Sequence, residues 1–117
     1  MSDSLRKAIH TDQAPKAIGP YSQAMEVDGW VYCSGQIPSV PEDGSIAHGI
    51  ENQAHQALKN LGEVLKAAGC GFEDVVKTQV YLSDMSDFEA VNRVYAEFFT
   101  NPFPARACIQ AAAVPQG

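Results

Sequence analysis

Arg106 has the clearest chemical potential of any side chain in this sequence of 117 residues. It follows Pro104 and precedes Cys108 and Gln110 by two and four residues, so the side chains of the last two share its face of a strand. A guanidinium binds a carboxylate through two parallel hydrogen bonds, which a lysine ammonium cannot match in geometry. The residues alone leave open whether Arg106 holds a ligand carboxylate or forms a structural salt bridge with an acidic neighbour.

Cys108 is a candidate nucleophile on the same face. A nucleophilic thiol requires a base and a positive electrostatic field. Arg106 would supply the field, but no histidine stands near Cys108 in the sequence to act as the base. Burial as a small apolar side chain is therefore the competing interpretation of Cys108.

Two turns combine small residues with polar ones and are candidate anion sites: Gly19-Pro20-Tyr21-Ser22 and Ser34-Gly35-Gln36. Turns of this composition can present backbone N–H groups to an anion. The same residues also suit ordinary turn chemistry, and Tyr21 could equally cap the edge of the core. Neither interpretation is excluded by the residues themselves.

The composition narrows the function classes. Eight Lys and Arg residues against 14 Asp and Glu give a net charge of −6, which disfavours nucleic-acid binding because that affinity depends on clustered cations. His10, His48 and His55 lack metal-site spacing and no nucleotide-binding loop occurs, so we expect neither a metal nor a cofactor. Three cysteines without a CxxC pair favour a reducing compartment, and no signal peptide or membrane-spanning run is found. We therefore expect a cytoplasmic protein without membrane partners.

Periodicity and turn chemistry predict the elements that position these residues. The Asp28-Gly29 pair predicts a hairpin, and Gly69 ends the first helix. The order of elements predicts an α+β fold in which two helices cover one face of a mixed sheet, while the other face is either solvated or a subunit interface. Strands are predicted over 5–9, 24–27, 30–34, 75–82 and 106–114, and a helix is predicted over 50–68. A second helix begins at a capping box over 86–89 and ends at Asn101-Pro102.

Several segments together resemble the RidA family, the reactive imine deaminases. Asn60-Leu61, Asp87-Phe88 and Val91-Asn92-Arg93-Val94-Tyr95 are similar to the two helices of that family. The resemblance runs from about Ile9 to Gly117, and the combination is far more specific than any one segment. The three remaining blocks are Ala14-Pro15-Lys16-Ala17-Ile18-Gly19-Pro20-Tyr21-Ser22-Gln23-Ala24, Ser34-Gly35-Gln36-Ile37-Pro38 and Phe103-Pro104-Ala105-Arg106-Ala107-Cys108.

The resemblance implies a chorismate-mutase-like α+β fold and a homotrimer with three sites in the clefts between subunits. It implies hydrolysis of reactive 2-imino acids (2-aminoacrylate with its imine 2-iminopropanoate, and 2-iminobutanoate) to 2-oxo acids and ammonia, without metal or cofactor. Arg106 matches the family's carboxylate-binding arginine, and Cys108 matches a position that acts largely through its backbone. The residues that match pocket-lining positions are Tyr21, Ser34, Gly35 and Asn92.

The resemblance also implies a single domain over residues 1–117 that is incomplete at its C-terminus. In the family a last strand follows the turn found here at Pro115-Gln116-Gly117 and carries a glutamate that positions or activates the attacking water. We expect that strand to be missing from this sequence. Two other functions stay open: a non-enzymatic, carboxylate-binding or chaperone-like homotrimer, and a ribonuclease, which the net charge of −6 disfavours.

Overall fold

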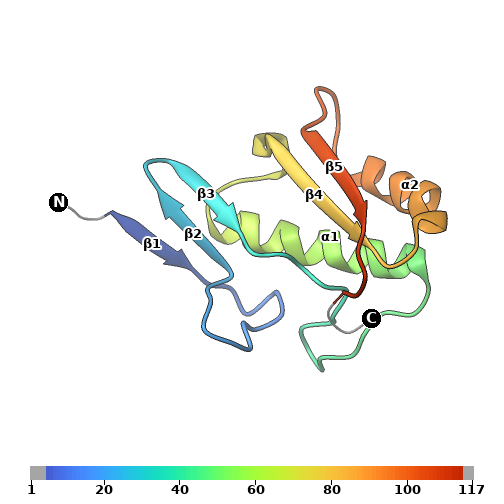
Figure 1. Ribbon diagram of the computed structural model, residues 1–117. Helices are drawn as coiled ribbons and strands as arrows, with labels where there is room; N and C mark the ends of the chain where they lie inside the picture. Colours follow the sequence, from blue (N-terminus) through green and yellow to red (C-terminus); the bar gives the residue numbers. More distant parts are fainter. Residues whose placement is uncertain (1–4, 115–117) are drawn as a thin grey trace.

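Five strands and two long helices make up the computed structural model, which describes residues 5–114 (Figure 1). The α+β class predicted from the sequence is confirmed, although the strand predicted over 106–114 already ends at residue 110. The turn predicted at 115–117, after which the resemblance implies a missing strand, lies outside the described residues. The elements are β1 (Arg6–Ile9), β2 (Ala24–Val27), β3 (Trp30–Cys33), α1 (Ile50–Ala67), β4 (Lys77–Leu82), α2 (Phe88–Phe98) and β5 (Ala105–Gln110), with short 3₁₀ turns at Phe72–Asp74 and Met85–Asp87.

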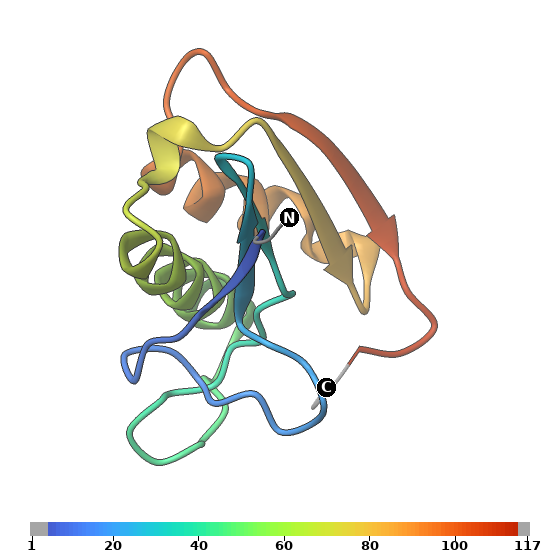
Figure 2. The same ribbon diagram turned by 90° about the vertical axis from the view of Figure 1, so that its left-hand side faces the viewer.

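The strands form two sheets. β1, β2 and β3 make an antiparallel sheet in that order, and β4 pairs in parallel with β5. Figures 1 and 2 show both helices on the same side of the strands, and α1 packs against α2. The opposite side of the strands therefore carries no helix in the described part of the chain, which leaves one sheet surface open.

Two local predictions are confirmed by backbone geometry. Asp28 and Gly29 have φ angles of 52° and 82°, so both turn residues between β2 and β3 are left-handed, as a tight hairpin requires. Gly69 has a φ of 80°, and the N–H of Cys70 donates to the carbonyl of Leu65 at 2.8 Å. This is the Schellman arrangement, in which a glycine in the left-handed region ends a helix without steric cost.

The capping box predicted at residues 86–89 is wrong. A 3₁₀ turn precedes α2, and the carboxylate of Asp84 accepts a hydrogen bond from the backbone N–H of Ser86 at 2.9 Å. Hydrogen bonds from that N–H and from the Ser86 side chain lower the pKa of Asp84. Asp87 is the residue at the N-cap of α2, and its side chain makes no capping bond. The acidic residue two positions before Ser86 therefore caps the turn, and Ser86 donates instead of accepting.

Asn60 is fully buried in α1, although its side chain is polar. Its amide group donates to the carbonyls of Ile37 at 3.0 Å and Ser39 at 2.8 Å, and its side-chain oxygen accepts from Gln56 at 2.9 Å. Three hydrogen bonds offset the cost of burying this amide. Asn60 therefore ties the segment after β3 to the helix layer.

Replacing Asn60 by alanine should lower the free energy of unfolding by about 2–4 kcal/mol, because two buried carbonyls and the Gln56 amide lose their partner. Urea denaturation at a fixed protein concentration measures this difference. Asn52→Ala is the matched control in the same helix, since Asn52 makes one exposed hydrogen bond to the His48 carbonyl. Equal, small losses in both variants would contradict a structural role for Asn60.

Candidate active site

Arg106 lies on β5 and turns toward the helix layer. Its register partner on β4 is Thr78, and its Nη1 donates a hydrogen bond to Oδ1 of Asn92 on α2 at 2.7 Å. The guanidinium carbon lies 4.8 Å from the centroid of the Tyr95 ring and 5.6 Å from that of Phe88. Both distances are within the range of cation–π attraction.

The guanidinium of Arg106 keeps donors that nothing in the described residues uses. Within residues 5–114, Arg106 forms no salt bridge, and its one side-chain hydrogen bond is that to Asn92. A structural ion pair of Arg106 is therefore not observed among the described residues. Since Asn92 engages Nη1, the edge formed by Nε and Nη2 has the geometry for two parallel bonds to a carboxylate.

A pocket of about 460 Å³ opens beside this guanidinium, and we refer to it as the arginine pocket. Aromatic and apolar side chains supply most of its wall, while a cation and an amide supply the polar groups. Such a lining suits a small organic anion, because apolar walls exclude water from a charged anchor. The lining residues are Asn92, Tyr95, Ala96, Phe103, Pro104 and Arg106.

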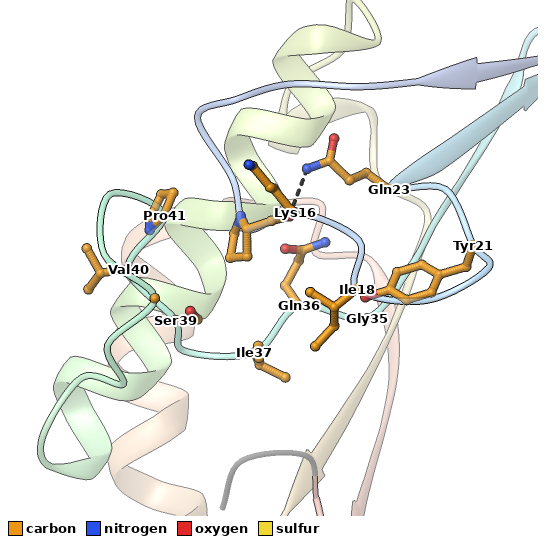
Figure 3. Close-up of a pocket in the computed structure, with 12 residues that line it drawn as sticks. Lys16, Ile18, Tyr21, Gln23, Gly35, Gln36, Ile37, Ser39, Val40 and Pro41 are labelled. Carbon is orange, nitrogen blue, oxygen red and sulfur yellow. Dashed lines mark hydrogen bonds between the residues drawn. The ribbon is translucent and has the colours of Figure 1, made fainter.

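A second pocket of about 440 Å³, here called the tyrosine pocket, lies between the segment before β2 and the segment after β3. Figure 3 shows the side chains of Tyr21 and Ile18 toward one end of it and those of Val40 and Pro41 toward the other. Its lining residues are Pro15, Lys16, Ile18, Tyr21, Gln23, Gly35, Gln36, Ile37, Ser39, Val40, Pro41 and Gly44.

Buried polar side chains hold the two walls of the tyrosine pocket. Gln23 donates to the carbonyls of Thr11 at 3.1 Å and Pro15 at 2.9 Å, and accepts from the Thr11 N–H at 2.7 Å. The hydroxyl of Ser34 donates to the Ser22 carbonyl at 2.6 Å and so joins the two walls. The bond from Ser34 connects the backbone next to Tyr21 with the backbone next to Gly35.

The residues predicted from the sequence thus fall into two places. Asn92 and Arg106 line the arginine pocket, whereas Tyr21 and Gly35 line the tyrosine pocket. Ser34 joins the walls of the tyrosine pocket rather than lining it, and the half-buried Cys108 lines neither pocket. One copy of the described chain therefore presents two separate pockets.

No sequence pattern assigned Tyr95 a role in the site. The residue is buried, but its ring also underlies Arg106, and its hydroxyl shares a 2.8 Å hydrogen bond with Oγ1 of Thr78. A tyrosine on the apolar face of a helix indicates such a hydrogen bond, because a buried phenol needs a partner.

Other titratable groups bear on what chemistry the site supports. Partial burial of its thiol, and then the neighbouring Cys70 thiol, raise the pKa of Cys33. A raised pKa disfavours the thiolate form that a nucleophilic cysteine needs. Within residues 5–114, no group of three or more His, Cys, Asp and Glu side chains is arranged to hold a metal ion. In the same residues, no helix combines the length and apolarity that crossing a bilayer requires.

Several known proteins are similar to this chain in sequence and in fold. A mouse protein named 2-iminobutanoate/2-iminopropanoate deaminase is 54% identical over 118 residues, which span all of this chain and 87% of the mouse protein. The crystal structure of RidA from an Antarctic Psychrobacter is 44% identical with a TM-score of 0.92, covering 95% of this chain and 90% of that one. The structure of E. coli TdcF with bound serine is 39% identical with a TM-score of 0.90, covering 94% of this chain and 89% of that one.

A family model described as Endoribonuclease L-PSP matches residues 11–117. That match covers nearly all of the chain and includes the residues of both pockets. The similarity to the mouse protein and to both solved structures extends over the same range. The chain therefore belongs to the Endoribonuclease L-PSP family, which is the RidA family that its sequence blocks resemble.

Proposed function

We propose that this chain catalyses the hydrolytic deamination of small 2-imino acids, such as 2-iminobutanoate and 2-iminopropanoate, to 2-oxo acids and ammonia. The arrangement of Arg106 is the observation that carries the proposal. Its guanidinium lies over an aromatic ring beside a pocket, with Asn92 on one nitrogen and a free edge suited to a carboxylate. The mouse relative bears the name of this activity and is 54% identical over the whole chain.

The reaction needs a held carboxylate and a water placed next to C2. Water adds its oxygen to the C2 atom of the imine, the C=N electron pair moves to nitrogen, and one proton of the water passes to that nitrogen. The resulting carbinolamine passes its hydroxyl proton to the amine, breaks its C–N bond, forms the C2 carbonyl and releases ammonia. In this proposal Arg106 holds the carboxylate next to C2, which converts a collision with water into an oriented reaction within the pocket.

The proposal further places each complete site between copies of the chain in a homotrimer. Two observations support it: the arginine pocket and the tyrosine pocket are separate in one copy, and the helix-free side of the strands exposes several large apolar side chains. Large apolar groups exposed on a sheet surface are typical of an interface. Those on the strands, with their exposed fractions, are Trp30 (58%), Tyr32 (64%), Tyr81 (53%) and Ile109 (47%).

Titration with 2-oxobutanoate, the product of one proposed substrate, tests the ligand side of this function. Heteronuclear NMR should show that addition of 2-oxobutanoate shifts the Nε–H resonance of Arg106 and that the shift saturates. Arg93 is the internal control, because its guanidinium is exposed and pairs with Glu51 at 3.0 Å. No shift at Arg106, or equal shifts at both arginines, would contradict a carboxylate site in the arginine pocket.

Cys108→Ala should retain deaminase activity within about threefold, because the proposed mechanism uses no thiol nucleophile. Cys108 lies two residues from Arg106 on β5, is half-buried and lines neither pocket. Loss of a true nucleophile would instead lower kcat by several orders of magnitude. Kinetics of the purified variant distinguish the two, and a large loss with an unchanged circular dichroism spectrum would make the thiol a participant.

A non-enzymatic carboxylate-binding protein is the second candidate, because the E. coli relative was solved with bound serine, which carries a carboxylate. A ribonuclease, the activity in the name of the family model, is less well supported. The net charge of −6 repels a phosphate backbone, and no histidine lines either pocket of the described chain. We also propose a cytoplasmic location, which the three free cysteines support.

A further inference from the structure

Tyr95 occupies the point where α2, β4 and β5 meet. Its hydroxyl lies 2.8 Å from Oγ1 of Thr78, which is the register partner of Arg106. Its ring stacks on that of Phe99 with centroids 4.4 Å apart and an interplanar angle of 25°. The residue is only 7% exposed. A hydrogen bond at one end and a stacked neighbour thus fix the ring in place.

The guanidinium of Arg106 lies over this fixed ring, with Cζ 4.8 Å from the centroid. Arg106 itself is exposed, and a free arginine side chain samples many rotamers. Asn92 constrains one nitrogen of the guanidinium but leaves its plane free to tilt about that bond. The ring face of Tyr95 removes this freedom, because cation–π attraction favours a guanidinium lying over the ring.

We propose that Tyr95 is a positioning residue: its ring, fixed by Thr78 and Phe99, orients the Arg106 guanidinium so that the Nε–Nη2 edge faces the carboxylate of a bound 2-oxo or 2-imino acid. The ligand part of this inference rests on the proposed function, whereas the ordering of Arg106 by Tyr95 does not. Because Tyr95 is proposed to act through Arg106, its loss should raise KM for the imino acid more than it lowers kcat.

The first test measures the order of arginine side chains in the protein without ligand. The NMR order parameter of the Arg106 Nε–H bond should exceed that of Arg93, whose salt bridge to Glu51 is exposed. Tyr95→Leu should lower the Arg106 value to that of Arg93. Equal order at both arginines in the unaltered protein would overturn the proposal, and that comparison decides it even if Tyr95→Leu does not fold.

The second test measures binding and catalysis in variants of α2. Tyr95→Leu should raise the Kd for 2-oxobutanoate and the KM for 2-iminobutanoate about fivefold, and Tyr95→Phe, which keeps the ring, should recover most of that loss. Phe98→Leu is the matched control, because Phe98 packs edge-on against His55 and Phe72 instead of Arg106.

An equal rise in Kd for Phe98→Leu and Tyr95→Leu would mean that α2 merely loosens, and would overturn the proposal. An unchanged Kd in Tyr95→Leu would overturn it as well. If the unaltered protein binds no 2-oxobutanoate, the proposed function is contradicted, because its carboxylate site binds no ligand. The order parameters of Arg106 then still decide whether Tyr95 positions the guanidinium.

Discussion

Arg106→Ala should reduce kcat/KM for 2-iminobutanoate by about 10³-fold while the protein stays folded. Two charge-assisted hydrogen bonds to a carboxylate are worth about 1.5–3 kcal/mol each, and alanine removes both. Arg106 is exposed and makes one side-chain hydrogen bond within the described residues, so its removal costs the fold little. Arg106→Lys keeps the charge but loses the planar pair of donors. Its kcat/KM should therefore lie between that of the unaltered protein and that of Arg106→Ala.

Arg93→Ala is the matched control for this experiment. Arg93 stands next to Asn92 on α2, but its guanidinium pairs with Glu51 on α1 and lines neither pocket. Its removal should change kcat/KM less than twofold, because exposed salt bridges contribute little. Activity retained in Arg106→Ala would remove this arginine from the mechanism, and equal losses in both variants would point to a general effect of charge.

Ile109→Glu should separate the copies of the chain and abolish the deaminase activity. Ile109 and its register partner Tyr81 lie on the helix-free face of β4 and β5. On that face of these two strands the one cation is Lys77, at the far end, because Arg106 faces the helices. Burying an unpaired carboxylate between copies is costly. With the arginine pocket and the tyrosine pocket of neighbouring copies apart, we expect a loss of at least about 100-fold, since small misplacements already cost that much.

Light scattering that reports molar mass, recorded together with kinetics, tests this prediction. The unaltered chain should have three times the monomer mass and the variant the monomer mass. Met85→Glu is the control, because Met85 is also an exposed apolar residue but lies in the 3₁₀ turn before α2. A monomeric variant that keeps full activity would contradict a site shared between copies.

Local chemistry explains which parts of the fold are predictable from the sequence. The Asp28-Gly29 hairpin and the Gly69 helix end depend on backbone angles that neighbouring residues determine, and both are confirmed. The capping box was wrong because the nearby Asp84 competes for the same backbone groups. The last strand ends at Gln110, whose side chain accepts a hydrogen bond from the Met85 N–H, a partner that periodicity cannot reveal.

The candidate site is less predictable because its contacts join distant segments. Asn60 bonds to carbonyls 21 and 23 residues away, and Tyr95 bonds to Thr78, 17 residues away. Periodicity treats such positions as polar or apolar and cannot supply their partners. The resemblance to a family implied a site role for Arg106 and Asn92. The structure places Nη1 of Arg106 2.7 Å from Oδ1 of Asn92. The resemblance could not indicate that Tyr21 and Gly35 line a different pocket.

The rate of 2-iminobutanoate loss tests the central claim most directly. Threonine dehydratase generates the imine from threonine in situ, and the purified chain is added at increasing concentration. We expect the loss of imine to accelerate in proportion to the chain, with 2-oxobutanoate and ammonia formed in equal amounts, and Arg106→Ala to leave the spontaneous rate unchanged. A spontaneous rate that the unaltered chain does not increase at any concentration would contradict the proposed deaminase function.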